Sequence, residues 1–578
     1  MVASNSRSSD CRGGAEGPVS GGLLNLSNRG QPGHRAEELV FVLKSVIAKQ
    51  RFQGKAILIQ PSDIKKYFDK EMIQDIILAC EKRGADAKAR RLWYKLNQET
   101  RIRVRTGAGM SDYEYVGAVV GQGTIGGALG SQAVLDEGIS GQFAPGGGDE
   151  LNYGGVPMAP LMFQDDLLHS TEGVKQARIA SMKIDIVLKQ LNLGLHEDKT
   201  VCIVMGSKKQ KQNIKTELEN QPLMCGSIET KLKDKVKWLG QILSTNGLAD
   251  SVAATVAARE DKILAAGREI GQIIGDWRAH LVGGMETALF LWESCCVPSL
   301  LNGAGTWTQI SVSTEKRLNA IQNIFLRLAF QTGPGSPLAS MAWDSGILDM
   351  SLRVWIEKIM LIIHIRNMDI DTLARRVYEE QKVQKWPGLA TETASFCQIL
   401  GIEDCNLTKL SKALYRQILV KACHSKNEQN LRSKATGKCV RIKEEKYGQK
   451  SYIQQKNIHM VREQYRTRWG LLPFAGNYSK DKRFAKTSWL CVCGEEREEE
   501  QHLLSGHCKV YGDLTHKYDN LAEDNQLVQF FAEVLARRDY LEVETCGSGV
   551  DTTVGANPGT MYQDKPAQGS PPIGLNQL

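Results

Sequence analysis

The chain has 578 residues, of which 42% are hydrophobic and 24% are charged. This length predicts three or four domains, and this composition excludes a chain that is disordered throughout. The mean hydropathy is -0.30, and no uninterrupted apolar run reaches the roughly 18 residues that cross a bilayer. Residues 1–34 are rich in Gly and Ser and lack the apolar segment of a secretory signal. We therefore expect a soluble intracellular protein, in the nucleus or the cytoplasm, with mostly reduced cysteines.

The charge is distributed unevenly along the chain. The net charge is +8, yet residues 409–486 alone contain twenty Lys and Arg against five Asp and Glu. One segment is therefore strongly basic, while the rest of the chain is mildly acidic. This asymmetry predicts a module that binds a polyanion, attached to a part with another role.

The first 245 residues alternate between helical and strand patterns. Apolar spacing predicts a helix from Ala36 that ends near Gly54, and Ala56–Ile59 predicts a short strand before Pro61. Glycine-rich stretches predict a turn at 121–130 and a loop at 141–155. Further helices are expected at 70–80, 85–96, 128–135 and 172–191, and further strands at 101–105, 158–162, 201–205 and 235–243.

Strand signals fade after residue 248. Apolar residues then recur at a 3.6-residue spacing, which predicts a helical domain up to about residue 400. Its helices are expected at 253–278, 286–296, 312–329 and 352–366, and one more helix is expected at 527–538. The expected parts are a disordered lead-in (1–34), a mixed domain (35–245), a helical domain (246–400), the basic segment (401–488), a Cys/His segment (489–514), a C-terminal helix (515–546) and a disordered tail (547–578).

Two adjacent carboxylates, Asp165 and Asp166, follow a predicted strand. Such neighbours repel each other unless a cation lies between them, and hard divalent cations bind to clusters of carboxylate oxygens. An isolated pair of this kind is most often a solvated turn. Here, however, a second acidic position, Asp63, follows the predicted strand Ala56–Ile59. Two strands that end in carboxylates can converge in an antiparallel sheet and hold two metal ions about 4 Å apart, as in-line phosphoryl displacement requires.

Three other short motifs accompany these carboxylates in a fixed order. Asp63 with Phe68 comes first, and the glycine-rich stretch 121–132 and the sequence Phe163–Asp166 follow. The last two are 193–200, which contains Lys199, and 238–240. In this order they resemble motifs A, B, C, D and E of the reverse transcriptases of non-long-terminal-repeat retrotransposons.

The resemblance implies both a fold and an activity. The implied fold is α+β, a reverse-transcriptase palm made of an antiparallel sheet with helices and reduced fingers. A helical thumb and a small zinc-knuckle-like region would follow it. The implied activity is that of an RNA-directed DNA polymerase with two Mg²⁺ ions, an RNA template, a DNA primer and deoxynucleoside triphosphates. By this resemblance Asp63, Asp165 and Asp166 hold the magnesium ions, and Lys199 stabilises charge on the departing pyrophosphate.

The resemblance also implies contacts with the substrates. Phe68 would occlude a ribose 2′-hydroxyl and so favour deoxynucleotides. Gln122 and Gly123 would contact the incoming nucleotide and the templating base. The primer grip would consist of Trp238, Leu239 and Gly240.

Two alternatives compete with a working polymerase. Only the short stretch 35–60 precedes Asp63 as candidate fingers, so the chain is alternatively a catalytically inactive, retroelement-derived nucleic-acid-binding protein. The spacing Gly121-x-Gly123-x-x-Gly126 also matches the fingerprint of a dinucleotide site. A strand with an acidic end should then follow about 20 residues later. The loop pattern at 141–155 disfavours that site.

A group of metal-binding residue types follows the basic segment. Cys491, Cys493, His502, His507 and Cys508 lie within a short span, and such sets bind zinc tetrahedrally. Reduced thiols without a metal are the simpler interpretation, but retrotransposon reverse transcriptases of this type often carry a Cys/His knuckle after the thumb. We predict Cys491, Cys493, His502 and Cys508 as ligands, with His507 as the competitor of His502.

The basic segment combines cations with aromatic residues. Arg462, Arg466 and Arg468 lie beside Tyr465 and Trp469. Cations follow phosphates, and aromatic rings stack on unpaired bases. We therefore predict that Arg462, Arg466, Arg468 and Trp469 bind nucleic acid.

Overall fold

The computed structural model describes most of the chain between residues 35 and 547. The described residues are 35–65, 67, 73–82, 84–98, 100–107, 109–117, 125–143, 151–158, 160–275, 284–333, 336–402, 410–472, 491–496, 498, 500–518 and 524–547. The expected disordered lead-in, 1–34, and all of the expected disordered tail, 547–578, except Gly547 at the end of a helix lie outside them. No helix in this described part is both long and apolar enough to cross a membrane.

The chain divides into two compact units. Unit 1 consists of Met1–Ala258, Leu301–Lys316 and Arg353–Ala422, and unit 2 of Arg259–Leu300, Arg317–Leu352 and Cys423–Leu578. These units do not follow the expected boundaries at residues 245 and 400. Helices from the expected thumb instead contribute to both units.

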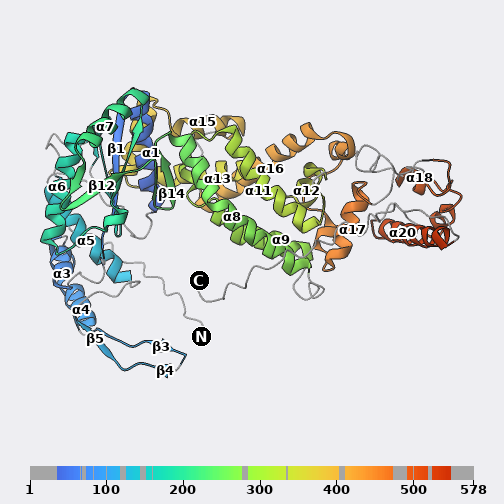
Figure 1. Cartoon of the computed structure of the whole chain (residues 1–578), viewed down its shortest axis with the longest axis horizontal. Coiled ribbons are helices and arrows are strands. Elements are labelled where there is room, and N and C mark those ends of the chain that lie inside the picture. Colours follow the sequence, from blue (N-terminus) through green and yellow to red (C-terminus); the bar gives the residue numbers. More distant parts are fainter. Residues whose placement is uncertain are drawn as a thin grey trace. The chain divides into compact units, whose positions relative to one another are not determined.

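A six-stranded sheet forms the centre of unit 1 (Figure 1). Its strands, in spatial order, are β11 (Leu223–Cys225), β12 (Ile228–Leu232), β10 (Val201–Gly206), β1 (Ala56–Asp63), β9 (Asp166–Thr171) and β8 (Leu161–Phe163). Strands β10 and β12 pair in parallel, and the other neighbours pair antiparallel. The predicted mixture of helix and strand is confirmed. The prediction of a purely antiparallel sheet is wrong, because the chain crosses over through helix α7 (Lys208–Asn220) between β10 and β11.

Alternate residues of the central strands serve two different cores. Ile57 and Ile59 of β1 face the core that contains helix α1 (Ala36–Phe52). Leu58 faces the opposite core, which contains residues of α6 (Val174–Gln190) and α7. Both faces of β1 are therefore buried, and its apolar residues run without interruption because neither face meets water.

Helix α1 is buried almost throughout, although its pattern predicts an exposed polar face. Its polar side chains have buried partners inside unit 1. Lys44 Nζ donates to Thr306 Oγ1 (3.1 Å), and Lys49 Nζ donates to the backbone oxygen of Asn152 (2.5 Å). Glu38 contacts His364 Nε2 (2.6 Å). Helices that follow the sheet in sequence cover the face of α1 that water would otherwise reach.

The remaining elements of unit 1 are short hairpins and helices. Before the sheet is complete, the chain forms α3 (Ile73–Lys82), α4 (Ala87–Asn97), β2 (Thr100–Ile102), β3 (Arg105–Thr106), β4 (Gly109–Met110), β5 (Glu114–Gly117), α5 (Ile125–Gln142), β6 (Leu151–Tyr153) and β7 (Val156–Met158). Helix η1 (Glu197–Lys199) lies directly before β10. After the sheet come the hairpin β13 (Lys235–Trp238) and β14 (Gln241–Ser244), and the helices η4 (Ala304–Thr306), α14 (Leu373–Gln384) and α15 (Leu389–Ile399). Residues of α14 and α15 pack in the same core as α1.

Four long helices begin in one unit and end in the other. They are α8 (Leu248–Gly275), α11 (Val312–Phe330), α13 (Met350–Arg366) and α16 (Lys412–Lys434). The other described helices of unit 2 are α9 (Gly284–Leu291), the π-helix η3 (Trp292–Cys296), α10 (Val297–Leu300), α12 (Leu338–Ser345), η6 (Gly437–Lys443), η7 (Ser451–Gln454), α17 (Ile458–Arg468), α18 (Glu500–Leu504), α19 (Gly512–Thr515) and α20 (Asp524–Gly547). The expectation of helices after residue 248 is therefore confirmed.

Candidate metal centres

The predicted acidic strand ends of unit 1 meet in the sheet. The register pairs Asp63, the last residue of β1, with Asp166, the first residue of β9. Asp165 lies in the two-residue turn between β8 and β9. Its backbone oxygen accepts a hydrogen bond from the amide of Ile64 (3.3 Å). The strand ends that carry Asp63 and the Asp165 and Asp166 pair therefore lie side by side in the sheet.

The turn that carries Asp165 has an unusual backbone. Gln164, its first residue, has a φ of 58°, in the left-handed region that favours glycine. A positive φ at the first central position is found in hairpin turns whose twist matches that of the two strands. A glutamine held in this conformation costs on the order of 1 kcal/mol, and such strain is concentrated at functional sites. This tight turn brings Asp165 and Asp166 to the end of β1.

Lys199 reaches the carboxylates from the segment that precedes β10. Leu195 forms an isolated antiparallel bridge with Ile64, and the amide of His196 donates to the backbone oxygen of Asp63 (2.9 Å). Helix η1 follows directly and places Lys199 Nζ 3.0 Å from Asp63 Oδ2. The structure thus brings Lys199 and Asp63 together.

The carboxylates influence one another electrostatically. Burial and then the charges of Asp165 and Asp63 together raise the pKa of Asp166 from its ordinary 3.8 to about 6, while the charge of Lys199 opposes the rise. The hydrogen bond to Asp63 and the charge of that group raise the pKa of Lys199. A single ammonium group therefore balances three acidic residues only in part. A divalent cation would balance them more fully.

The three acidic residues fit magnesium in their chemistry, although their oxygens are not gathered around one point. Among the described residues, the one group of donors close enough to share an ion is the Cys/His cluster of unit 2. Hard oxygen donors at a partly buried strand end are nevertheless the ligand type that Mg²⁺ prefers.

The expected substrate contacts are described only in part. Phe68, Gln122 and Gly123 lie outside the described residues. The expected primer grip is the turn of the β13 and β14 hairpin, where Leu239 and Gly240 have φ values of 43° and 73°. Two successive positive φ values are typical of a type I′ turn.

The tryptophan of this hairpin has a structural role. The side chain of Trp238 is 3% exposed and belongs to the core that contains α1. Of the three predicted grip residues, Leu239 and Gly240 alone form the turn. Trp238 anchors one strand of the hairpin to unit 1.

The Cys/His cluster is assembled in unit 2. One ligand atom from each of Cys491, Cys493, His502 and Cys508 lies within 4.8 Å of all the others. The sulfurs of Cys491 and Cys508 are 3.7 Å apart, and Cys493 Sγ lies 3.4 Å from His502 Nε2. Tetrahedral zinc with Zn–S bonds of about 2.3 Å separates two sulfur ligands by about 3.8 Å. These four residues could therefore hold a metal ion such as zinc.

Local backbone structure positions the four donors. The amide of Gly494 donates to the oxygen of Cys491 (2.7 Å), and the amide of Cys491 donates to the oxygen of Glu496 (2.7 Å). Gly494 has a φ of 78°, which permits this tight turn. On the other side, Cys508 accepts a bond from the amide of Gly512 (2.7 Å). The cluster also belongs to an apolar core with residues of α20.

The structure distinguishes the two candidate histidines. Glu496 Oε2 lies 3.0 Å from His502 Nδ1, so the carboxylate orients the ring and leaves Nε2 directed at the cysteines. A carboxylate on the far nitrogen is the usual support of a metal-binding histidine. His507 is exposed and is not in the cluster. His502 is therefore the histidine of this site.

The ionisation of the thiols differs within the cluster. Burial opposes ionisation of Cys493, but hydrogen bonds with the backbone of Glu495 and Glu496 outweigh it and lower its pKa to about 7. Burial raises the pKa of Cys491.

Four protein donors would leave no open position on a tetrahedral ion, and such closed sites have structural roles.

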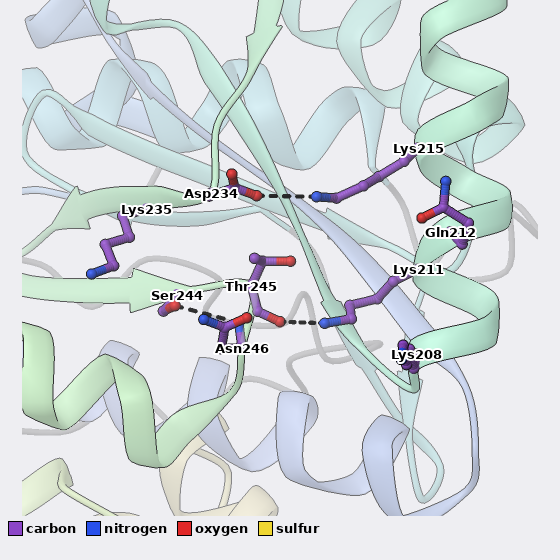
Figure 2. A pocket seen from close by; sticks show the side chains of 9 residues that line it. All are labelled: Lys208, Lys211, Gln212, Lys215, Asp234, Lys235, Ser244, Thr245 and Asn246. Carbon is purple, nitrogen blue, oxygen red and sulfur yellow. Dashed lines mark hydrogen bonds and ion pairs between the residues drawn. The ribbon is translucent and has the colours of Figure 1, made fainter.

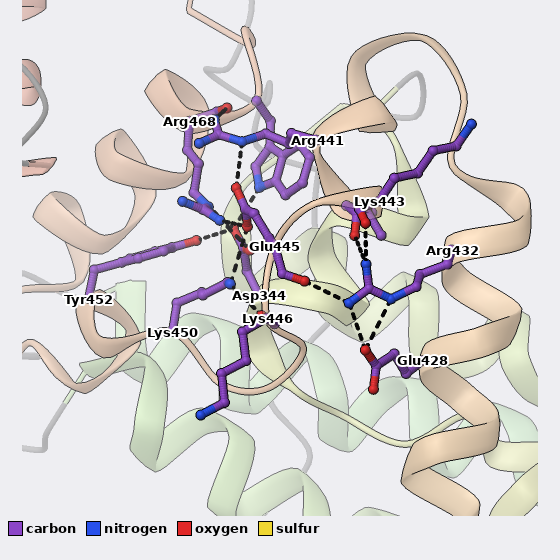
Figure 3. Close-up of polar contacts among 12 residues, drawn as sticks. Asp344, Glu428, Arg432, Arg441, Lys443, Glu445, Lys446, Lys450, Tyr452 and Arg468 are labelled. Atoms are coloured by element: carbon purple, nitrogen blue, oxygen red, sulfur yellow. Dashed lines mark hydrogen bonds and ion pairs between the residues drawn. The ribbon is translucent and has the colours of Figure 1, made fainter.

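Two of the four predicted nucleic-acid-binding residues, Arg462 and Trp469, are buried in unit 2. Arg462 is 2% exposed and Trp469 is 1% exposed. Arg468 forms an ion pair with the buried Asp344 (3.2 Å) and another with Glu445 (Figure 3). Arg462 Nε donates to the backbone oxygen of Ala329 (3.0 Å). The burial of Arg462 and Trp469 and the ion pairs of Arg468 therefore do not support the prediction that these three residues grip nucleic acid.

A buried acidic residue that the sequence analysis missed explains this arrangement. Asp344 accepts hydrogen bonds from Tyr452 (2.7 Å) and from Trp469 Nε1 (2.6 Å), in addition to its ion pair with Arg468. Burial raises the pKa of Asp344, while Arg468 opposes that rise. Arg466 is the most accessible of the three arginines, and it bonds to Glu463 (2.5 Å). The end of helix α17 is thus tied to internal partners in unit 2.

The sequence has no recognised relative in two comparisons. No known protein family matches the chain, and no curated protein matches it.

Proposed function

We propose that unit 1 is an RNA-directed DNA polymerase, a reverse transcriptase of the type found in non-long-terminal-repeat retrotransposons. The observation that supports it best is the register of the sheet, which pairs Asp63 with Asp166 and adds Asp165 from the adjoining turn. The order of the five sequence motifs supports it independently. The position of Lys199 beside Asp63 supports the assignment of residues 193–200 as the fourth motif.

The proposed chemistry is transfer of a deoxynucleotide to the 3′-hydroxyl of a primer. Asp63, Asp165 and Asp166 would hold two Mg²⁺ ions, which when bound stabilise the charge that develops on the α-phosphate. Lys199 is largely exposed at the site and carries its proton firmly because of Asp63. It can therefore place a positive charge beside the negative charge of the departing pyrophosphate.

The alternative function, an inactive protein that binds nucleic acid, loses one of its supports. That interpretation placed nucleic-acid binding in residues 409–514, where Arg462 and Trp469 are buried and Arg468 pairs with Asp344. The acidic residues at the end of β1 and β9 favour the polymerase. The alternative is retained as an outcome of the test.

Primer extension tests the proposal. The full chain is incubated with a primed RNA template, deoxynucleotides and Mg²⁺, and the products are compared with those of Asp165→Asn and Asp198→Asn. Asp198 is an exposed acidic residue beside Lys199. It lies in helix η1 and not at a strand end, so it is a matched control. We expect Asp165→Asn to reduce extension on the order of a hundredfold or more, since it removes charge stabilisation at the reacting centre. We expect Asp198→Asn to retain extension.

Two results would overturn the proposal. Extension that is equal in the unsubstituted protein and in Asp165→Asn would show that another site performs the reaction. A folded protein that binds RNA but extends no primer in Mg²⁺ or Mn²⁺ would support the inactive alternative.

A further inference from the structure

A basic pocket lies in unit 1 between helix α7 and the base of the β13 and β14 hairpin (Figure 2). Its volume is about 320 Å³. It is lined by Lys208, Lys211, Gln212, Lys215, Asp234, Lys235, Ser244, Thr245 and Asn246. None of these residues belongs to the proposed polymerase site or to the Cys/His cluster.

The spacing of residues on α7 explains why lysines line this pocket. Lys208, Lys211 and Lys215 recur at intervals of three and four residues, so they share one face of the helix. Ile214 and Leu218 lie on another face, which packs in the core of the sheet. The helix therefore buries its apolar face and presents a row of ammonium groups to the pocket.

Two of the lysines are held by protein partners. Lys215 Nζ forms an ion pair with Asp234 (3.0 Å), and Lys211 Nζ donates to the backbone oxygen of Thr245 (2.5 Å). In the described part of the chain, Lys208 and Lys235 form no ion pair. Asp234 is thus the single acidic residue among four lysines of the lining.

The electrostatics of Lys211 reflect this excess of positive charge. Its pKa is lowered, first by burial and then by the charges of Lys215 and Arg51, while Asp234 opposes the change. Outside the lining, Asp250 accepts a hydrogen bond from Ser244 Oγ (2.5 Å) and brings one more negative charge nearby. The net charge of the side chains around the pocket remains positive. An anion would relieve the repulsion among the lysines.

We propose that this pocket binds a phosphate group. Lysine ammonium groups act as point charges for phosphate, and the side-chain amides of Gln212 and Asn246 add hydrogen-bond donors at the wall. No aromatic or large apolar side chain lines the pocket, so it offers no surface for a base or a ring. Its volume of about 320 Å³ is ample for a phosphate group. The phosphate belongs either to a nucleic-acid backbone or to a free anion.

The pocket is separate from the acidic strand ends. The register pairs Ala56 at the start of β1 with Gly206 at the end of β10, and α7 begins two residues later. Asp63 lies at the other end of β1, seven residues away, which corresponds to about 23 Å along an extended strand. The phosphate site therefore stands independently of the proposed polymerase activity.

Two matched pairs of substitutions test the site in the full chain. Lys208→Gln with Lys235→Gln removes the two lysines that form no ion pair, and Lys209→Gln with Lys233→Gln removes two exposed neighbours that do not line the pocket. Each pair removes the same charge from the same elements or their edges. All four side chains are exposed, so both proteins are expected to fold normally.

The first measurement uses inorganic phosphate as the probe. Melting temperatures are compared in phosphate and in chloride at equal ionic strength. A site that binds phosphate in the folded state alone raises the melting temperature. We expect this rise in the unsubstituted protein and in the Lys209 and Lys233 variant, and its loss in the Lys208 and Lys235 variant.

The second measurement uses a single-stranded RNA oligonucleotide and follows its affinity against salt concentration. Each phosphate contact contributes about 0.7 to the slope of log affinity against log salt for a single strand. If the phosphate belongs to a nucleic-acid backbone, the Lys208 and Lys235 variant flattens this slope by about 1.4, and the control pair does not. A response to inorganic phosphate without a change of slope supports the site and assigns it to a free anion. Equal behaviour of the two variants in both measurements would overturn the proposal.

Discussion

At the scale of single residues, the acidic strand ends show how strand pairing can hold carboxylates that repel each other close together. Asp63 and Asp166 face each other because strand pairing fixes their backbones, and they cannot move apart without breaking the register. Lys199 compensates part of the repulsion through Asp63. The raised pKa of Asp166, about 6, records the part that is not compensated. Such groups are more stable with a bound cation than without one.

Substitution of Asp166 by Asn should therefore stabilise the protein in the absence of metal. The pKa of Asp166 rises from 3.8 to about 6 on folding, so stability falls as pH rises from about 4 to about 6 and stays lower above that range. At pH 7.5 in EDTA we expect Asp166→Asn to raise the free energy of unfolding on the order of 1 kcal/mol, after discounting for solvent screening. Mg²⁺ should then stabilise the unsubstituted protein and not the variant. Equal stabilisation of both by Mg²⁺, measured by thermal unfolding, would contradict a metal site at these residues.

His169, further along β9, should make unit 1 sensitive to acid. Its side chain is buried, neither ring nitrogen has a hydrogen-bond partner, and burial lowers its pKa from 6.5 to about 4. Because the unfolded chain binds a proton that the folded one rejects, stability is complete above pH 6.5 and falls as pH decreases to about 4, by about 3 kcal/mol at most. Urea unfolding at pH 7 and at pH 5 measures this loss. His169→Gln should show a smaller difference between the two pH values, whatever its absolute stability; an unchanged difference would exclude His169 as the cause.

At the scale of elements, the sequence predicts helices and strands well where local patterns are strong. The predicted helix from Ala36 and the strand from Ala56 are observed, but the strand continues through Pro61 to Asp63. The stretch 235–243, predicted as one strand, is a hairpin, because Leu239 adopts a positive φ that its residue type does not signal. Helix α7 and its row of lysines were missed, since its mostly polar sequence gives a weak apolar period.

The candidate sites, too, could be predicted from the sequence only where their pattern is local. The acidic strand ends and the four Cys/His donors could be predicted, because motif order and ligand spacing are written in the sequence. The choice between His502 and His507 required the structure, since it depends on the position of Glu496. The burial of Arg468 could not be predicted, because a count of charges does not show that Asp344 lies beside it.

The Cys/His cluster provides a prediction with a built-in control. His502→Gln should lower the zinc content of the reduced, purified protein well below one ion per chain, since it removes one of four donors. His507→Gln should leave it unchanged, because that side chain is exposed and outside the cluster. Elemental analysis after removal of loosely bound metal measures both. Zinc that is absent from the unsubstituted protein, or lost equally from both variants, would rule out this ligand set.

At the scale of the whole molecule, the basic segment shows that net charge and accessible charge are different quantities. Residues 409–486 carry twenty Lys and Arg. Several of them have protein partners within unit 2. Arg432 bonds to Glu428 and to backbone oxygens, and Arg441 pairs with Glu445 (Figure 3). Lysines that the local count did not emphasise line the pocket beside α7 instead. The sites of anion binding therefore depend on which cations lack an internal partner.

This argument predicts losses of stability of different size for two arginines of the same helix, α17. Arg468 is 12% exposed and pairs with the fully buried Asp344, so its removal leaves an uncompensated charge in the interior. Loss of one partner of a buried pair costs about 3–5 kcal/mol, while a surface pair contributes less than about 1 kcal/mol. We therefore expect Arg468→Ala to lower the free energy of unfolding by about 3 kcal/mol, and Arg466→Ala, whose partner Glu463 is exposed, to lower it by less than about 1 kcal/mol.

Urea unfolding followed by tryptophan fluorescence measures these losses, and RNA binding is measured below the unfolding transition of each protein. Because Arg468 faces Asp344 and Glu445 inside unit 2, its loss should leave the salt dependence of RNA binding by folded protein unchanged. Asp344→Asn should destabilise unit 2 in the same way, since it breaks the same pair from the other side. If Arg468→Ala instead keeps full stability and weakens RNA binding, then Arg468 faces nucleic acid in solution and the internal role assigned to it is wrong.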